Sequence, residues 1–439
     1  MHIATPTIRL LVLILAEYSI EPDGAFGAAG KAIFPVRGDS MTADELIQVL
    51  NRGCAGGLTA IRSVTKLQPA GGAGDKIFPP TYDKGTYAWE TRKLDGQAVQ
   101  TVLLDSVQSQ ANRFEELLLD AFRMGRLAMP VFEMSIAGHD VTSLTVPHRV
   151  HDAILRDSIW DGKPFRESDD GKRLVSARAW NATAFFEFAP TVLLFGTWDS
   201  QSGGGVNTAK VARCLVSEII AIDFVRGVRT SSRIDPLGIK LVPEVIAKVE
   251  GPEQWKFVDP TGTGKKVKKD GGNLRPSEIN HGNVTPSITD SETGPGGITC
   301  REAIQTTVLS LTQLRKLHFR GADGSSSAER DIAGRAVIAA LGLLAVTLHQ
   351  EDGYQLRSRC QLVPSEAPRF EVIGRTEKER DTFELDSAAA EGALNGTLEA
   401  ARKAGLAWHA GRIELQPRPD LVKLVAYSDG TTGGGVEGE

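Results

Sequence analysis

Two spacings of apolar residues occur along the chain, one typical of helices and the other of strands. Residues 106–124 follow the helical spacing, because Ser106 suits an N-cap and Val107 and Phe114 fall on one face of the helix that follows. Residues 60–67 (AIRSVTKL) instead alternate apolar and polar side chains, which predicts a half-buried strand.

The same patterns predict the remaining elements. Further helices are expected at residues 43–53, 147–157, 207–222, 300–317, 328–349 and 385–405. Further strands are expected at residues 99–104, 132–136, 190–198, 240–249, 354–362 and 421–426. These elements lack the regular rhythm of a barrel or a doubly wound sheet. The expected class is therefore α+β, with an antiparallel sheet, helices on one side and long insertions. We expect residues 41–430 to form a single domain.

Two stretches do not fit a packed core. Residues 250–298 are rich in Gly, Pro, Lys and Asn and hold few large apolar side chains. Such a composition cannot bury a core of its own, so an extended or mobile insertion is expected there. Residues 431–439 (TTGGGVEGE) are expected to form a disordered tail.

The N-terminal 40 residues contain an apolar run, residues 9–16 (RLLVLILA), which is too short to span a bilayer as a helix. Three interpretations compete: a signal peptide, an additional strand, or a start codon assigned too far upstream. We favour the third, because Met41 directly precedes the capped helix start TADEL. A secreted binding protein would follow from the first.

Composition limits the kinds of function. The formal net charge of −5 is evidence against a uniformly basic nucleic-acid binder, so any RNA contact must use a local basic surface. The four cysteines lie far apart without a C-x-x-C pair, which favours reduced thiols in a cytoplasmic protein and disfavours a zinc site. No membrane association is expected.

Motifs for catalysis are weak throughout. Residues 262–266 (GTGKK) resemble a phosphate loop, but Asp259 stands where the first glycine belongs and Lys266 where Ser or Thr belongs. His148 and His151 share a helix face, yet no convincing third metal ligand lies nearby, and a polar or RNA-facing helix end explains them better. No G-x-S-x-G elbow occurs. We therefore expect no catalytic residue, metal or cofactor, and a protein that is not an enzyme.

Basic and hydroxyl-bearing residues give the best signal for nucleic acid. Arg226, Arg229 and Arg233 occur with Ser231 and Ser232 in a segment without any acidic residue. Guanidinium groups bind phosphate through two donors at once, and hydroxyl groups add shorter contacts. The alternative, a solvated loop whose arginines pair with acids elsewhere, fits the spacing equally well.

Three further groups of residues belong to the predicted RNA-binding set. Four lysines within the insertion would repel one another unless a polyanion neutralised them, although a solubilising loop is an equal alternative. The other two groups open the helix at 106–124 and the helix at 147–157. The members of these groups are Lys265, Lys266, Lys268, Lys269, Gln110, Asn112, Arg113, His148 and Arg149.

Seven strings in order resemble signatures of one CRISPR-associated RAMP family. They are 104–115 (LDSVQSQANRFE), 147–158 (PHRVHDAILRDS), 195–200 (FGTWDS), 229–239 (RTSSRIDPLGI), 283–287 (NVTPS), 297–299 (GIT) with 308–319 (VLSLTQLRKLHF), and 353–360 (GYQLRSRC). The ordered set is similar to the Csb-type backbone proteins, of the Cas-seven group, in type I-U (I-G) CRISPR systems. The resemblance covers about residues 60–365.

This resemblance implies an RRM-like (ferredoxin-like) RAMP core and a place in the Cascade surveillance complex. Several copies of the chain would line one CRISPR RNA beside other Cascade subunits, and the guide would pair with target DNA in antiviral defence. Residues 250–298 would correspond to a thumb-like element. The resemblance supplies no catalytic residue. The aromatic RNP pattern of ordinary RRMs is missing from the predicted strands, so contact with the RNA backbone through loops is expected.

The main alternative is a RAMP endoribonuclease that processes precursor CRISPR RNA. In that hypothesis His148 or His151 acts as general acid or base.

Overall fold

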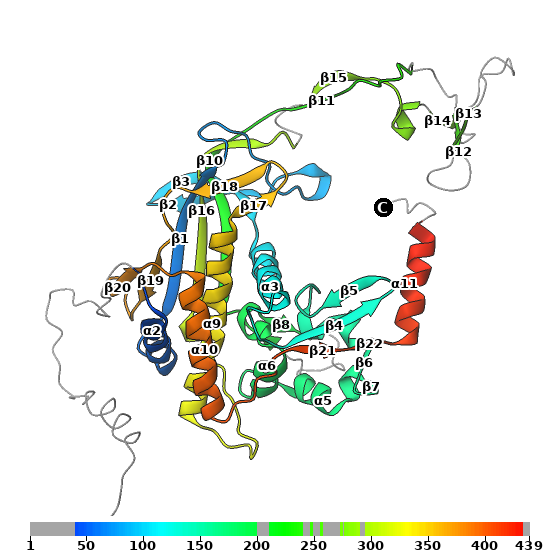
Figure 1. Ribbon diagram of the computed structural model, residues 1–439. Helices are drawn as coiled ribbons and strands as arrows, with labels where there is room; N and C mark the ends of the chain where they lie inside the picture. Colours follow the sequence, from blue (N-terminus) through cyan, green and yellow to red (C-terminus); the bar gives the residue numbers. More distant parts are fainter. Residues whose placement is uncertain are drawn as a thin grey trace, which may run out of the picture.

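The computed structural model describes residues 40–199, 210–239, 246–248, 255–257, 273–274, 276–289 and 295–432. The expected N-terminal extension, apart from Ser40, and the tail from residue 433 onward lie outside these ranges, as do Lys265, Lys266, Lys268 and Lys269. Figure 1 gives the arrangement of the elements.

An antiparallel sheet forms the centre of the molecule. Seven of its strands form one path, in the order β17 (Tyr354–Arg357), β18 (Cys360–Pro364), β1 (Ala60–Pro69), β16 (Ile298–Ser310), β10 (Leu215–Arg226), β3 (Gln97–Asp105) and β2 (Trp89–Leu94). Beside this path, β19 (Phe370–Ile373) pairs with β1 and with β20 (Arg380–Phe383).

Four strands of this sheet and two helices form a ferredoxin-like core. Along the chain they are β1, α3 (Val107–Arg123), β10, β16, α9 (Ala328–Asp352) and β18, a β-α-β-β-α-β succession. In space the strands lie in the order β18-β1-β16-β10, so each helix crosses between strands that run parallel without touching. This topology confirms the expected α+β class and its RRM-like core. The β2–β3 hairpin extends the sheet beyond β10.

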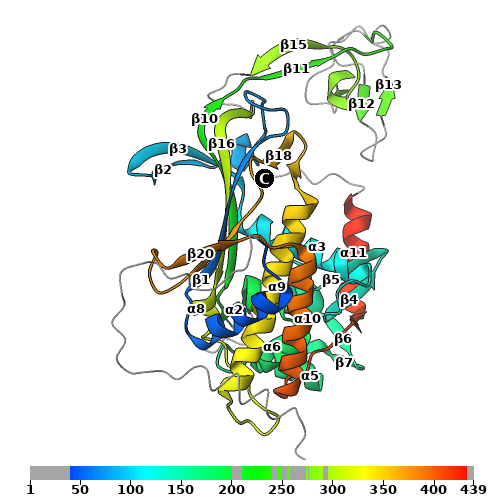
Figure 2. The same cartoon turned by 60° about the vertical axis from the view of Figure 1, so that its left-hand side comes forward.

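Helices cover one face of the sheet (Figure 2). α9 packs against α3, α10 (Ser387–Lys403) and α2 (Ala43–Ala55), and α8 (Leu311–Leu314) follows β16. Among the described helices, α9 alone is long and apolar enough to cross a membrane, and nearly all of it is buried inside the protein.

None of the described helices covers the opposite face of the sheet (Figure 2). Along β1 the side chains of Ser63, Thr65 and Leu67 are buried, whereas Val64 and Lys66 between them are exposed. Across the neighbouring strands, Val64 lies beside Thr306 and then Glu218. These three outward positions carry one aliphatic and two polar side chains.

A large insertion follows α3. It contains β4 (Val131–Ile136), β5 (His139–Thr142), α4 (Ala153–Arg156), β6 (Ser158–Trp160), β7 (Lys163–Pro164), α5 (Asp169–Ser176), α6 (Thr183–Phe188), α7 (Thr191–Phe195), β8 (Thr197–Trp198) and β9 (Lys210–Val211). The C-terminal segment returns to it: β21 (Arg412–Glu414) pairs with β4, β22 (Gln416–Pro417) pairs with β6, and α11 (Pro419–Thr432) follows. Phe186 contacts both Phe319 and Trp408, so the insertion shares the core of the helical layer.

Between β10 and β16 the chain leaves the sheet as a long arm (Figure 1). β11 (Arg229–Arg233) and β15 (Val284–Thr289) form a two-stranded ribbon, and β12 (Ile246–Lys248), β13 (Trp255–Phe257) and β14 (Asn273–Leu274) form a small separate sheet. β13, β14 and β15, which fall within residues 250–298, thus lie in the arm outside the central sheet.

Four predicted elements are wrong. Of the predicted helix at residues 207–222, the described residues 210–222 contain β9 and most of β10 instead, and residues 300–317 contain most of β16 and α8. In β10 both Ile219 and Ile222 are buried although they face opposite sides, and in β16 the buried position Gln305 is polar. Apolar and polar residues therefore do not alternate clearly along the sequence of either strand.

The other two errors concern short apolar segments. Residues 191–195 form α7, which is followed by Gly196 with φ of +81°, and residues 197–198 form the short strand β8. Residues 421–426 belong to α11 instead of a strand. Periodicity alone does not separate a short buried helix from a buried strand. Residues 147–157 are helical as expected, but as two turns separated at Asp152. Residues 354–362 form the hairpin of β17 and β18.

Candidate nucleic-acid interface

The predicted arginine segment lies at the root of the arm. The guanidinium of Arg226 lies over the Trp89 ring, 5.2 Å from its centroid. Arg229 is exposed and lines a cavity of about 500 Å³ together with Phe78 and Tyr87. The Arg233 side chain instead donates two hydrogen bonds, of 3.0 and 2.9 Å, to the carbonyl of Gly282 across the ribbon. Arg229 therefore faces outward, while Arg233 joins the two strands of the arm.

The two serines of this segment also have different environments. Ser231 shares a 2.8 Å hydrogen bond with Ser287 on the partner strand, and Ser232 is exposed. Beyond them Asp235 accepts backbone N–H groups of Leu237 and Gly282, and these hydrogen bonds hold the pKa of its carboxyl below the usual value. Asp235 thus stabilises the turn of the chain after β11.

The prediction for Gln110 is wrong. Its side chain is fully buried, donates to Asp105 at 2.7 Å, and accepts from Ser217 and Gln305, each at 2.8 Å. The reason is helical geometry: Gln110 lies one turn before Phe114, so it faces the core. It belongs to a buried polar network between α3 and the sheet and has no surface to offer to RNA.

Arg113 belongs to the same network. Its Nε donates to the buried carboxylate of Asp105 at 2.9 Å, which also accepts from Arg357 at 3.3 Å. A buried carboxylate needs such partners to remain charged. The guanidinium of Arg113 is thus used inside the protein, contrary to its predicted role. Asn112, on the other face of α3, is exposed.

Asn112 lines a cavity of about 550 Å³, which we call the α3 pocket. Its lining comes from three segments besides α3 and is formed by Gln108, Asn112 and residues 147–149, 195–198 and 210–213. Parts of the first three strings of the family resemblance therefore meet at one place, although they lie far apart in the sequence.

Arg149 forms the base of the α3 pocket. It adopts a φ of +53°, and its guanidinium donates two hydrogen bonds, of 2.6 and 2.7 Å, to Glu115. It also lies over the ring of Phe195, 5.3 Å from the centroid. Burial raises the pKa of Glu115 to about 7, against the opposing charge of Arg149 and hydrogen bonds from Arg149 and Thr191. The predicted RNA contact by Arg149 is therefore corrected to a buried ion pair.

A turn at Gly196 places the opposite wall of the pocket. A Cβ at this position would lie 3.0 Å from both the Arg213 Cγ and the Val211 carbonyl oxygen, so only glycine allows the two segments to approach this closely. After the turn, Trp198 of β8 lies directly opposite Lys210 of β9. The indole of Trp198 is 62% exposed.

The charge of the α3 pocket is positive. Within the part of the chain that the structure describes, no acidic residue lines it, and no ion pair engages Lys210 or Arg213. Burial lowers the pKa of Arg213, and the nearby charge of Arg149 lowers it further. Lys210 and Arg213 thus supply two cations to the cavity without a described acidic partner. Arg149 also lines the cavity, but its guanidinium is paired with Glu115.

The two histidines of this region have different environments. His148 is exposed and lines the α3 pocket. His151 shares a 2.8 Å hydrogen bond with Thr197 through Nδ1, and its Nε2 is buried without a partner among the described residues. Burial lowers the pKa of His151 to about 4, against the opposing charge of Asp199. A neutral, enclosed imidazole is poorly suited to exchange protons with RNA.

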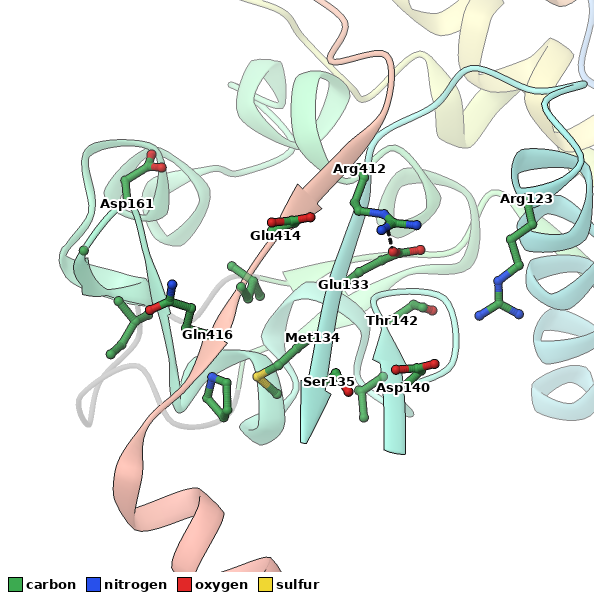
Figure 3. Close-up of a pocket in the computed structure, with 15 residues that line it drawn as sticks. Arg123, Glu133, Met134, Ser135, Asp140, Thr142, Asp161, Arg412, Glu414 and Gln416 are labelled. Carbon is green, nitrogen blue, oxygen red and sulfur yellow. Dashed lines mark ion pairs between the residues drawn. The ribbon is translucent and has the colours of Figure 1, made fainter. Parts of the chain in front are cut away.

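A cavity of about 880 Å³ between β4, β5 and β21 has the opposite charge (Figure 3). Arg412 of β21 pairs with Glu133 of β4 at 2.6 Å, and three more carboxylates line the same cavity. These are Asp140, Asp161 and Glu414. An excess of carboxylates repels phosphate, so this cavity does not fit a nucleic-acid strand. Across the described ranges, no group of three potential ligands is placed to hold a metal ion.

Three residues of the α3 pocket were not foreseen. Trp198 lies within one of the recognised strings, but the sequence alone predicts no binding role for its indole. Lys210 and Arg213 fall within the predicted helix at residues 207–222, where the described residues form strands. The sequence signal that could have singled them out is an aromatic residue followed by two cations across a stretch, 200–209, that contains no acidic residue.

The segment that builds the pocket is similar to a known protein family. The sequence model of the CRISPR-associated protein GSU0053 family matches residues 61–226, which is less than half of the chain and spans β1 to β10. No curated protein matches the sequence.

Among solved structures, Thermofilum pendens Csc2 is matched with 12% identity over 85% of this chain and 77% of that protein, with a TM-score of 0.22. So low a score establishes no common fold. The family match instead covers every residue that lines the α3 pocket. The resemblance of this chain to a CRISPR-associated family is therefore confirmed over residues 61–226.

Proposed function

We propose that this chain is a CRISPR RNA-binding backbone subunit of a Cascade surveillance complex of type I-U (I-G). The observation that carries the proposal is the α3 pocket, an acid-free cavity with the cations Lys210 and Arg213 inside the segment similar to the GSU0053 family. Phosphate groups attract cations that have no acidic partner, and a strand of RNA presents one phosphate per nucleotide.

Two further features support this function. The ferredoxin-like core leaves one face of the sheet without a described helix over it, beside the root of the arm, where Arg229 is exposed. The arm itself is rich in exposed apolar side chains, among them Ile234, Leu237 and Ile288. Exposed apolar groups of this kind mark contacts with other chains. In the proposal the arm is the thumb-like element.

The proposed assembly is the one that the family resemblance implies. Copies of the chain line one guide RNA in the cytoplasm, other Cascade subunits join them, and target DNA pairs with the guide. The chain itself performs no catalysis in this proposal. The environment of His151 supports that view, because its partial burial lowers its pKa to about 4 and so disfavours a general acid at neutral pH.

The test uses the full-length purified chain and a labelled CRISPR RNA. Binding is measured by fluorescence anisotropy between 50 and 300 mM salt, at about neutral pH, and we expect affinity to fall steeply as salt rises. Nuclease protection should extend along the guide as protein is added. Absence of RNA binding would overturn the proposal.

The same RNA decides between the proposal and the endoribonuclease alternative. Repeat-containing precursor RNA is incubated with the chain in the absence of divalent metal. We expect the RNA to remain intact. Specific cleavage that is lost in the His148→Ala variant would instead establish the alternative.

A further inference from the structure

We propose that the α3 pocket is a subsite for one nucleotide of single-stranded RNA, whose base stacks on Trp198 and whose phosphate lies between Lys210 and Arg213. The inference rests on the proposed function and specifies the ligand of this one site.

The stacking surface is the first argument. Trp198 is 62% exposed although it is an indole on a strand that pairs directly with β9. An exposed aromatic ring at the edge of a cavity is a platform for a base, because every base has a flat face. The turn at Gly196 and the pairing of Trp198 with Lys210 set the backbone position from which this ring extends beside the cavity.

The phosphate position is the second argument. Lys210 lies opposite Trp198 in the ribbon, and the stem of Arg213 packs against Gly196 two residues before that ring. Arg213 is held near Arg149, a like charge, without a described acid to pair with it. An anion placed between Arg213 and Lys210 would offset this repulsion, and guanidinium is well suited to phosphate.

The remaining residues that line the pocket favour a nucleotide over a simple anion. Gln108 and Asn112 present amide groups, which both donate and accept hydrogen bonds, and His148 is exposed beside them. Such groups suit base edges and ribose hydroxyls, where RNA offers both kinds of partner. A cavity of about 550 Å³ lies within the range of small-ligand sites, roughly 300–1,000 Å³, and is too small for a duplex.

A second exposed tryptophan provides a matched control. Trp180 is 61% exposed and also lines a cavity, of about 670 Å³, with Arg173 and Arg320. There, however, Arg173 is paired with Asp170 and Glu187, and Arg320 donates to Ser326. This second cavity therefore has an exposed ring, but its Arg173 is paired with acids and the carboxylate of Glu187 belongs to its lining.

The experiment measures the affinity of the full chain for a labelled single-stranded guide RNA by anisotropy. Trp198→Ala should weaken binding about tenfold, Trp198→Phe should retain most of it, and Trp180→Ala should leave it unchanged. Arg213→Gln should weaken binding and reduce the slope of log affinity against log salt by about one. Thermal unfolding of each variant checks that it remains folded.

Two failures are distinguishable. If the wild-type chain does not bind guide RNA, the proposed function fails. If the wild-type chain binds but Trp198→Ala and Arg213→Gln bind as tightly as Trp180→Ala, the function stands and the nucleotide subsite is overturned. Quenching of tryptophan fluorescence by RNA gives an independent readout, because it should be reduced in Trp198→Phe and preserved in Trp180→Phe.

Discussion

Arg149 and Glu115 form a buried ion pair through two hydrogen bonds, of 2.6 and 2.7 Å, directly beneath the α3 pocket. The pair joins the start of the 147–158 segment to α3, and the Arg149 guanidinium also donates to the carbonyl of Gly196 at 3.2 Å. One cation therefore holds three walls of the cavity together. Its contribution is structural, and this predicts where its loss is felt.

Arg149→Ala should destabilise the fold by about 3 kcal/mol or more, because it leaves the Glu115 carboxylate buried without its partner. The measurement is urea-induced unfolding monitored by circular dichroism. Arg213→Ala, which removes an arginine of the same pocket without a described acidic partner, is the control and should cost far less. Equal stabilities for the two variants would contradict the assigned role of the pair.

The same pair gives a pH dependence. Since burial raises the pKa of Glu115 to about 7 from its ordinary 4.5, the folded state binds a proton more readily than the unfolded chain between these values. The stabilisation by this proton is present at low pH and is lost as pH rises through about 7. In Arg149→Ala the opposing charge is gone, so the deficit in stability should grow between about pH 6 and 8. A pH-independent deficit would argue against this reasoning.

His349 predicts acid sensitivity. It lies between Phe114 and Tyr354, with ring centroids 5.3 and 5.1 Å away, and burial lowers its pKa from 6.5 to about 4. The unfolded chain therefore binds the proton first, and stability falls as pH decreases from about 6.5 to 4. At pH 5 this amounts to about 2 kcal/mol.

Replacement of His349 by Phe should remove the part of the acid-induced loss of stability that this histidine causes. The measurement compares free energies of unfolding at about pH 7.5 and pH 5 for the wild type, for His349→Phe and for a variant of the exposed His148. The His148→Ala chain should retain the wild-type difference. If His349→Phe loses as much stability on acidification as the wild type, another group is responsible.

Gly196→Ala should disturb the α3 pocket as well as the backbone. The substitution combines strain at φ of +81° with 3.0 Å contacts to Arg213 and Val211. Gly138→Ala is a matched control, since Gly138 has φ of +82° and open space around its Cβ position. Both variants should lose about 1–3 kcal/mol of stability, but only Gly196→Ala should also lose RNA affinity. Equal RNA affinities would show that the turn does not position the site.

Arg229→Gln should weaken binding of guide RNA several-fold and reduce the salt slope by about one, because Arg229 is exposed at the root of the arm. Arg233→Gln should act differently, since Arg233 donates to the Gly282 carbonyl. Its loss should increase amide hydrogen exchange along β11 and β15. If both substitutions leave RNA affinity unchanged, the arm root is not part of the RNA interface.

Local chemistry made part of this fold predictable. Ser106 caps α3 by accepting from the Ser109 N–H, as its sequence position suggests, and α9, with its long apolar stretch, ends at the C-cap Gly353. The core strands β10 and β16 were less accessible to sequence reasoning, because burial on both faces of β10 and the inward polar chain of Gln305 remove the alternation that identifies strands.

The candidate site was predictable in location more than in its residues. Asn112 and His148 do line the α3 pocket, but Gln110 could have been excluded, since it lies four residues before Phe114 on the apolar face of the same helix. Nothing local in the sequence indicated that Arg149 would pair with Glu115, 34 positions away. Such pairing depends on tertiary contacts that no short pattern encodes.

The acid-free cavity in a chain of net charge −5 has a consequence for kinetics. In dilute salt, where the Debye length reaches about 30 Å at 0.01 M, the net charge of the whole molecule repels a polyanion over long distances, whereas close to the cavity Lys210 and Arg213 attract it. Dilute salt leaves the repulsion unscreened, and concentrated salt removes the attraction. Association with RNA should therefore be fastest at an intermediate ionic strength, a dependence that a uniformly basic protein would not have.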